Sequence, residues 1–185
     1  MSNYSTNAYR KHGVSEQDRD TMENEYAVFF WRNPCVFNNW CACEFIYKGI
    51  AYRCSEQALM HQKALLMGDA KTAAEMLLTH DPALHKKLGR KVKGFDQAKW
   101  NQHKEQLMYE ILLAKFSQNE AMKQQLLQTG TKYLGEASCF DKVWGIGVDS
   151  RSLIKYASWT ECQQHFRGEN LLGKALMRVR KELAP

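Results

Sequence analysis

Residues 55–67 read Ser-Glu-Gln-Ala-Leu-Met-His-Gln-Lys-Ala-Leu-Leu-Met, and this stretch predicts a helix that carries charges on an apolar face. Glu56 and Lys63 are seven residues apart. Seven steps of about 100° end about 20° short of two full turns, so both charges lie on one helix face. The same face carries four apolar side chains: Leu59, Met60, Leu66 and Met67. The polar face, with Gln57 and His61, is expected to point elsewhere.

The charges at these two positions point to function. An unpaired charge in an apolar setting is penalised by desolvation. Buried titratable groups are also where perturbed pKa values and catalysis concentrate. Glu56 and Lys63 are therefore the first candidates for catalytic residues.

The surrounding patterns predict an α+β fold, a mainly helical single domain with a small β-sheet. The apolar run 27–31 suits a buried strand, and residues 43–52 suit a hairpin that turns at Lys48-Gly49. Ser55 is the expected N-cap of the helix that follows the hairpin. Residues 148–168 are expected to form a loop, long enough to suspect function. Further helices are predicted to start at four residues: Asp81, Asp96, Asn119 and Asn170.

Composition indicates an ordinary globular protein. The 185 residues are 44% hydrophobic and 25% charged, as in a soluble domain with a sizeable core. We expect a loose tail at residues 1–25 and one domain at 26–185. No run approaches the ~20 uncharged apolar residues that cross a bilayer, so no membrane association is expected. The N-terminus lacks the apolar core of a secretion signal, which makes a cytoplasmic location the expectation.

The six cysteines are expected to be free thiols that serve as small core residues. Cys41 and Cys43 are too close together for the usual zinc-binding spacing, and no second pair lies at a matching interval. We therefore expect no metal and no other cofactor.

The net charge of +6 arises from 26 Lys and Arg against 20 Asp and Glu. Its densest part is residues 85–93. Two explanations of this basic stretch remain open. The cations either stabilise the C-terminus of a helix or form a patch that faces phosphate groups.

Four segments combine aromatic, charged and glycine residues: 37–40, 55–63, 89–100 and 141–147. Each alone has a simple structural explanation. Together they supply indole rings for stacking on bases, an arginine that matches phosphate, and carboxylates that suit an oxocarbenium-like centre. This combination of side chains fits a ligand with an aromatic base and a phosphorylated sugar. Gly145-Ile146-Gly147 is not a dinucleotide fingerprint, since the third glycine is missing.

At these segments the chain resembles the NADAR family, which includes the bacterial YbiA-like proteins. The resemblance runs from about Phe29 to about Leu183. It rests on ordered motifs: Phe37-Asn38-Asn39-Trp40, Ser55-Glu56, Gln62-Lys63-Ala64, Leu88-Gly89-Arg90, Trp100 with Met108, Lys115-Phe116, Gly135-Glu136-Ala137-Ser138, Asp141-x-x-Trp144-Gly145-Ile146-Gly147 and Gly168-Glu169-Asn170-Leu171-Leu172-Gly173.

This resemblance implies a YbiA-like fold and cleavage of N-glycosidic bonds in ribosyl nucleotides. The family is associated with two substrates: early riboflavin-pathway intermediates and ADP-ribosylated guanine. The family's functional residues fall on five positions of this chain: Glu56, Lys63, Trp100, Asp141 and Trp144. The chain departs from the family at Asn38, often Ser, and at Gln57, often His, which weakens a mechanism that needs a histidine beside Glu56.

We therefore expect a metal-independent N-glycosidase, a hydrolase acting on a ribosylated base that is free or carried on DNA or RNA. The expected catalytic residues are Glu56, Lys63 and Asp141. The expected substrate-binding residues are Asn39, Arg90, Trp100, Trp144 and Gly145. Five of them are predicted to converge on one cleft: Glu56, Lys63, Trp100, Asp141 and Trp144.

Alternatives remain open for the mechanism and for the function. Either a carboxylate stabilises an oxocarbenium ion and activates water, or Lys63 attacks the anomeric carbon and forms an imine. The rival functions are a non-catalytic nucleotide or ADP-ribose binding module and a nucleic-acid-binding protein.

Overall fold

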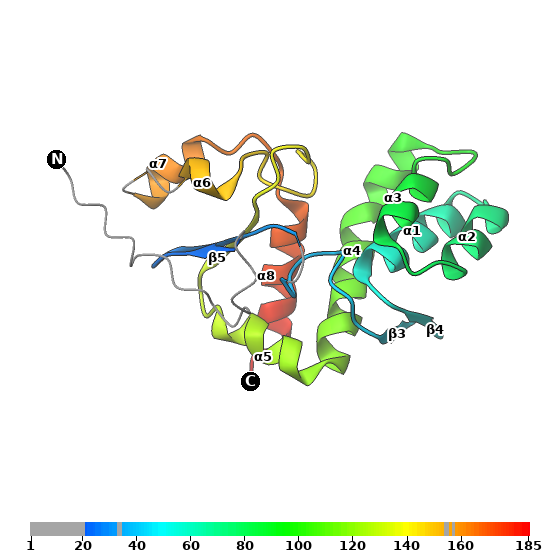
Figure 1. Cartoon of the computed structure of the whole chain (residues 1–185), viewed down its shortest axis with the longest axis horizontal. Coiled ribbons are helices and arrows are strands. Elements are labelled where there is room, and N and C mark those ends of the chain that lie inside the picture. Colours follow the sequence, from blue (N-terminus) through cyan, green and yellow to red (C-terminus); the bar gives the residue numbers. More distant parts are fainter. Residues whose placement is uncertain (1–20, 33–34, 154–155, 157) are drawn as a thin grey trace. The chain divides into compact units, whose positions relative to one another are not determined.

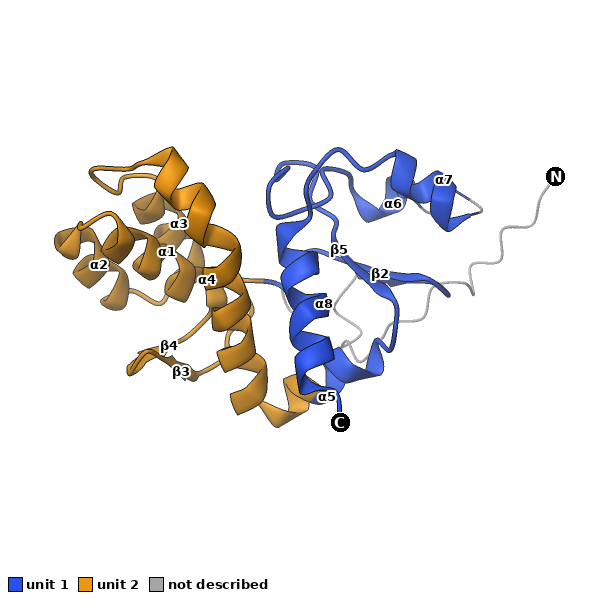
Figure 2. Cartoon of the chain, turned by 180° about the vertical axis from the view of Figure 1, so that it is seen from behind, with its two compact units in different colours: residues 1–38, 124–185 blue, residues 39–123 orange. Residues whose placement is uncertain are grey.

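The computed structural model describes residues 21–32, 35–153, 156 and 158–185. The chain forms two compact units. Unit 1 comprises residues 1–38 and 124–185, and unit 2 comprises residues 39–123 (Figure 2). Both contain helices and short strands, so the chain is mainly helical with small sheets, as predicted.

Unit 1 contains a three-stranded sheet with the order β1-β2-β5; Figure 1 labels β5, and Figure 2 labels β2 and β5. β1 (Met22–Glu23) is antiparallel to β2 (Ala27–Phe30), and β2 is parallel to β5 (Tyr133–Glu136). The register pairs Ala27 with Tyr133. Of the tail predicted at residues 1–25, residues 1–20 lie outside the described residues, whereas Met22–Glu23 form β1.

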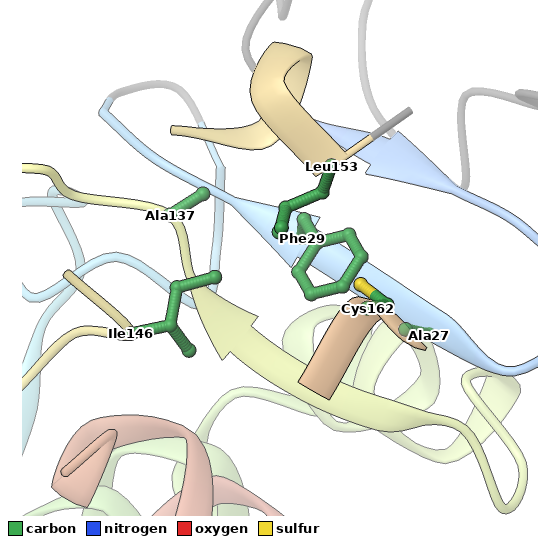
Figure 3. Packing of buried hydrophobic residues seen from close by; sticks show 6 residues of the cluster. All are labelled: Ala27, Phe29, Ala137, Ile146, Leu153 and Cys162. Atoms are coloured by element: carbon green, nitrogen blue, oxygen red, sulfur yellow. The ribbon is translucent and has the colours of Figure 1, made fainter. Parts of the chain in front are cut away.

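The core of unit 1 lies against this sheet. It comprises Ala27, Phe29, Ala137, Ile146, Leu153 and Cys162 (Figure 3). Two of these residues come from short helices: α6 (Ser150–Leu153) and α7 (Trp159–Gln164). The prediction of a loop over residues 148–168 is therefore wrong in part. The side chain of Ser158 caps α7 by accepting the Glu161 N–H at 3.2 Å, and burial of Leu153 and Cys162 stabilises these short helices.

The last helix of unit 1, α8 (Leu171–Leu183), packs on β5. Asn170 precedes α8 as predicted, but its side chain does not cap the helix. The amide nitrogen donates to Leu134 O at 2.9 Å and to Tyr133 Oη at 2.8 Å. The amide oxygen accepts the Glu136 N–H at 3.1 Å. Asn170 therefore ties the start of α8 to β5.

Unit 2 begins with the predicted hairpin, β3 (Phe45–Tyr47) and β4 (Ile50–Tyr52). Lys48 and Gly49 form its two-residue turn, and both have positive φ, 51° and 77°, as a tight hairpin requires. The edge of β3 is covered by a side chain from α4. Gln118 Oε1 accepts the Ile46 N–H, and Gln118 Nε2 donates to Ile46 O, both at 2.8 Å. The amide thus replaces a neighbouring strand.

Four helices form the rest of unit 2: α1 (Ser55–Leu66), α2 (Ala70–Leu77), α3 (Pro82–Gly89) and α4 (Gln97–Gln118). α1 packs against the other three (Figure 1). α5 (Glu120–Gln128) follows, and the boundary between the units falls within it.

Side chains start these helices largely where predicted. Asp81 accepts the Ala83 N–H at 2.9 Å, and Asp96 accepts the Lys99 N–H at 3.0 Å. The prediction for α1 is wrong by one residue, because Cys54 is the N-cap and its Sγ accepts the Gln57 N–H at 3.4 Å. Burial raises the pKa of Cys54 to about 11, so this cap is a neutral thiol near pH 7.

The cysteines are free, and Cys35, Cys41, Cys54 and Cys162 are buried as predicted. Cys43 is half-buried, and Cys139 is exposed. Among the described residues, no helix has both the length and the apolar character needed to cross a membrane.

Candidate active site

The first turn of α1 holds Glu56 beside Asn39. The Glu56 N–H donates to the carbonyl oxygen of Asn39 at 2.9 Å. Both residues are buried. In the described part of the chain, two fully covered oxygens here have no hydrogen-bond partner, Asn39 Oδ1 and Ser55 Oγ. Buried polar atoms nearly always have a hydrogen-bond partner in folded proteins. The start of α1 therefore has two buried oxygens with unused capacity to accept a hydrogen bond.

The last turn of α1 places Lys63 in an aromatic environment. Its Nζ donates to the carbonyl oxygen of Gly89 at 2.8 Å. The same Nζ lies 4.3 Å from the centroid of the Phe95 ring and 5.6 Å from that of Trp100. Both distances are within the range of cation–π attraction. The amine is therefore held by one carbonyl group and two rings.

Gly89 allows this carbonyl group to come close. A Cβ at position 89 would lie 2.1 Å from Met60 Sδ on α1. Any larger residue would force α3 away from α1 or displace Met60. The absence of a side chain at Gly89 thus lets the end of α3 pack closely against Met60 of α1, beside Lys63.

Burial and charge act on Lys63 in opposite directions. Desolvation lowers its pKa from the ordinary value and is the larger cause, whereas the negative charge of Glu56 raises it. The net direction is down, which increases the fraction of neutral amine at a given pH. A neutral amine is the form in which lysine acts as a nucleophile.

The other face of α1 is not solvent-exposed, although the sequence suggested a polar face. Gln57 and His61 are both buried. Gln57 accepts the Arg53 N–H at 2.9 Å and donates to Met76 O and Thr79 O, at 3.1 and 3.2 Å. The polar face is satisfied internally, and Gln57, where the family often has histidine, joins α1 to the end of α2.

His61 belongs to a buried network with Tyr52 and Gln62. Its Nδ1 lies 2.9 Å from Tyr52 Oη, which in turn accepts the Gln62 amide at 3.0 Å. The Tyr52 hydroxyl and the His61 ring nitrogen thus share one hydrogen bond inside the protein. Burial also lowers the pKa of His61. This histidine is a structural part of unit 2.

The remaining predicted residues lie in unit 1, in the segment 141–147. Asp141 Oδ1 accepts the N–H groups of Val143 and Trp144, at 3.1 and 2.9 Å. Asp141 thus shapes the turn that presents Trp144, as an Asx-type turn does. The Trp144 side chain is half-buried, so part of its ring faces solvent.

Backbone hydrogen bonds fix this turn to the start of α8. Gly145 O accepts the Asn170 N–H at 3.0 Å, and Trp144 O accepts the Leu172 N–H at 3.1 Å. A Cβ on Gly145 would lie 2.8 Å from Glu136 O. Gly145 therefore serves close backbone approach within unit 1, and the helix N-terminus is capped by the turn.

The structure thus brings together Asn39 with Glu56 and Lys63 with Trp100, all in unit 2. Arg90 follows α3 as an exposed C-cap residue. Lys86 and Lys87 lie in the last turn of α3, where the helix dipole stabilises positive charges. Asp141, Trp144 and Gly145 belong to unit 1, so their convergence with the others stays a prediction.

Sequence reasoning missed Phe95, although a signal for it exists. Phe95 precedes the N-cap Asp96, and Trp100 occupies the fourth position of α4. An apolar pair at these two positions is the pattern of a hydrophobic staple. The pattern predicts that both rings lie on one side of the helix start, where the structure places Lys63.

The described residues contain no group of three or more His, Cys, Asp and Glu arranged to hold a metal ion.

Comparison with known proteins places the chain in a family of enzymes. The NADAR domain matches residues 29–184. An N-glycosidase of Acanthamoeba polyphaga mimivirus is 37% identical over 87% of this chain and 98% of its own length. A riboflavin biosynthesis protein of Vibrio vulnificus is 28% identical over 86% of this chain and 39% of its own length. The chain belongs to the NADAR family.

The fold agrees with this assignment. The solved structure of the Escherichia coli protein YbiA superposes with a TM-score of 0.69 and 26% identity, over 90% of each chain. The predicted YbiA-like α+β fold is confirmed.

Proposed function

We propose that this protein is an N-glycosidase that hydrolyses the bond between a ribose and a nitrogen base. Membership of the NADAR family and the N-glycosidase relative support this reaction class. The observation that carries the proposal is the setting of Lys63, whose pKa is lowered by burial while Glu56 lies on the same helix. A structural lysine needs neither a lowered pKa nor two rings around its amine.

The first chemical route uses Lys63 as the nucleophile. The lone pair of the neutral amine attacks C1′ of the ribose, and the bond between C1′ and the base nitrogen breaks. The base leaves with the bonding electrons and takes up a proton. The C1′–O4′ bond then breaks, O4′ takes up a proton, and an imine forms between C1′ and Lys63. Water adds to C1′, and the C1′–nitrogen bond breaks, which releases the free amine and the ribose aldehyde. In this route, Glu56 is the candidate acceptor for the ammonium proton.

The second route uses water directly. Here the bond to the base breaks first, and a carboxylate stabilises the positive charge that develops on C1′ and the ring oxygen. The carboxylate then takes a proton from the attacking water. Glu56 and Asp141 are the candidates for this role, and Lys63 would only bind substrate. The two routes differ in whether a covalent adduct forms.

The substrate is proposed to be ADP-ribosylated guanine or a ribosylated pyrimidine intermediate of riboflavin biosynthesis. The riboflavin biosynthesis relative supports the second. For binding, we propose Asn39, Arg90, Trp100, Trp144 and Gly145. Among these, Asn39 has a buried oxygen without a partner in the described residues, and Trp144 has a partly exposed ring. Whether the guanine is free or part of DNA or RNA is settled by comparing the three substrates.

The test is to incubate the purified protein separately with ADP-ribosylated guanosine, with ADP-ribosylated DNA and RNA, and with the ribosylated pyrimidines. Release of the free base is followed by chromatography. The matched control is Lys71→Ala, which removes an exposed lysine of α2. Base release from one substrate, lost in Lys63→Ala and kept in Lys71→Ala, supports the proposal. Tight binding of ADP-ribose without base release would identify a binding module instead.

A further inference from the structure

Lys63 is covered by two rings of unequal exposure. Trp100 is 8% exposed and belongs to the core of unit 2, whereas Phe95 is 43% exposed. The Phe95 ring is also the nearer of the two to the amine, at 4.3 Å against 5.6 Å. A molecule that approaches the Lys63 amine from solvent past these two rings therefore contacts Phe95 before it contacts Trp100.

The backbone around Phe95 is anchored on both sides. The Lys93 N–H donates to Asp69 Oδ2 at 2.9 Å. The Asp96 N–H contacts Met67 Sδ at 3.3 Å. Between them Gly94 has a φ of +64°, a conformation that a residue with a side chain rarely adopts. The chain thus makes a fixed bend that holds Phe95 above Lys63.

Hydrophobic burial alone does not explain this arrangement. A ring that is 43% exposed contributes only part of the free energy that full burial of a phenylalanine would give. Phe95 is thus an exposed aromatic side chain next to the amine, and aromatic side chains bind nucleobases by stacking. Phe95 can therefore contact both Lys63 and an aromatic ligand.

We propose that Phe95 is a positioning residue that holds the Lys63 amine against Gly89 and shields it from water, and that its exposed side stacks on the base of the substrate. The ligand class is a heteroaromatic base attached to the ribose carbon that reacts. The stacking role of Phe95 rests on the proposed N-glycosidase function. The positioning role concerns Lys63 in the free protein and does not depend on that function.

The charges around Lys63 define what a change at Phe95 does. On its own helix, Glu56 raises the pKa of Lys63, and burial lowers it further than Glu56 raises it. Three other charged residues lie at the ends of the neighbouring helices: Asp69 before α2, Arg90 after α3 and Asp96 before α4. Removing the Phe95 ring exposes the amine to water and leaves these charges in place. Loss of the cation–π contact acts in the opposite direction, because that contact favours the ammonium form. Since desolvation is the largest cause of the lowered pKa, we expect the Lys63 pKa to move up toward its ordinary value.

Three variants separate the two roles. Phe95→Tyr keeps an aromatic ring, which can both cover the amine and stack on the base. Phe95→Leu keeps an apolar cover on the amine but offers no aromatic face. Phe95→Ala removes both. The control is Leu77→Ala, because Leu77 lies on α2 with a similar exposure of 37%. Thermal melts of all variants identify any that fail to fold.

The first measurement is the Michaelis constant and turnover rate for base release. Loss of a stacking contact is expected to raise KM about tenfold in Phe95→Leu and Phe95→Ala, a factor equal to about 1.4 kcal/mol. Phe95→Tyr and Leu77→Ala are expected to keep the wild-type KM. A wild-type KM in both Phe95→Leu and Phe95→Ala would overturn the stacking role.

The second measurement needs no substrate. The rate at which an amine-specific reagent modifies Lys63 is followed against pH by mass spectrometry. The midpoint of this profile is expected to shift to higher pH in Phe95→Ala and to stay at or below the wild-type value in Phe95→Leu. Identical profiles in all variants would overturn the positioning role.

The two measurements also separate this inference from the proposed function. If the wild-type protein releases no base from any substrate, the proposed function fails and the stacking role fails with it. The modification profile then still decides the positioning role. If base release is found and KM does not depend on Phe95, the proposed function stands and the stacking role is overturned.

Discussion

Lys63 Nζ lies 4.3 Å from the centroid of the Phe95 ring. Its hydrogen bond goes to a main-chain carbonyl group, that of Gly89. A main-chain carbonyl carries no net charge, so this contact does not hold the amine in its charged form as a carboxylate would. Within the described residues, the hydrogen bond of the Lys63 amine thus goes to this neutral carbonyl group and not to a carboxylate. This setting suits an amine that must lose a proton before it reacts.

Glu56→Gln is expected to separate binding from turnover. The Glu56 N–H that bonds to Asn39 belongs to the backbone, so the substitution leaves this contact intact. Loss of an acid–base group lowers turnover on the order of 10²–10⁴-fold, while ligand affinity is retained. Steady-state kinetics and ligand titration measure the two effects. The control is Glu75→Gln, an exposed carboxylate on α2. Equal losses of affinity and turnover would point to a structural role for Glu56.

The two tryptophans are expected to respond oppositely to replacement by alanine. Trp100 is 8% exposed, so Trp100→Ala should lower the free energy of unfolding by ~3–5 kcal/mol, as for other large buried aromatics. Trp144 is half-buried in a turn, and Trp144→Ala should weaken substrate binding with little change in melting temperature. Thermal melts and ligand titrations decide this. Unfolding of Trp144→Ala together with a stable Trp100→Ala protein would reverse the assignment.

Unit 2 is expected to lose stability as the pH falls below about 6.5. Burial lowers the pKa of His61 and of His85 from their ordinary value of 6.5. Because the folded-state pKa values lie below those of the unfolded chain, the stability that the neutral rings contribute is present above pH 6.5. It is lost as the pH falls toward the folded-state values.

Melting temperatures at pH 7.5 and pH 5 test this expectation. His61→Gln should lower stability at pH 7.5 and flatten the decline between the two values. His103 is exposed, so His103→Gln should keep the wild-type pH dependence. The same slope in wild type and His61→Gln would show that another group causes the decline.

Activity is expected to survive a chelator. The reaction routes proposed above use only Lys63, Glu56 and Asp141, and the described residues offer no cluster that could hold a metal ion. Base release measured before and after dialysis against EDTA checks this. Loss of activity that added zinc or magnesium restores would contradict it.

Local signals in the sequence predicted much of the fold. Asp81 and Asp96 start their helices as expected because a side-chain acceptor near the first N–H groups is a local property. The Lys48-Gly49 turn was predictable for the same reason. Cys54 was missed because a thiol is a weak acceptor and becomes a cap only in this buried setting. α2 is as long as α3 and was not predicted, although Asp69 accepts the Thr72 N–H at 3.1 Å at its start.

Contacts between distant parts of the chain were not predictable. The parallel pairing of Ala27 with Tyr133 depends on packing across more than half of the sequence, and the patterns of either strand do not specify it. The candidate site shows the same limit. The helical period placed Glu56 and Lys63 on one face, but the carbonyl group of Gly89 reaches Lys63 only because α3 packs on α1.

If Lys63 is the reactive amine of an N-glycosidase, a hydride donor should trap its imine with the ribose. The protein is mixed with its substrate and a hydride donor, and the adduct is located by mass spectrometry. We expect a stable ribosyl adduct on Lys63 that is absent from Lys63→Ala, together with loss of turnover in that variant. An active Lys63→Ala protein, or no adduct at single turnover, would contradict the claim and favour direct attack by water.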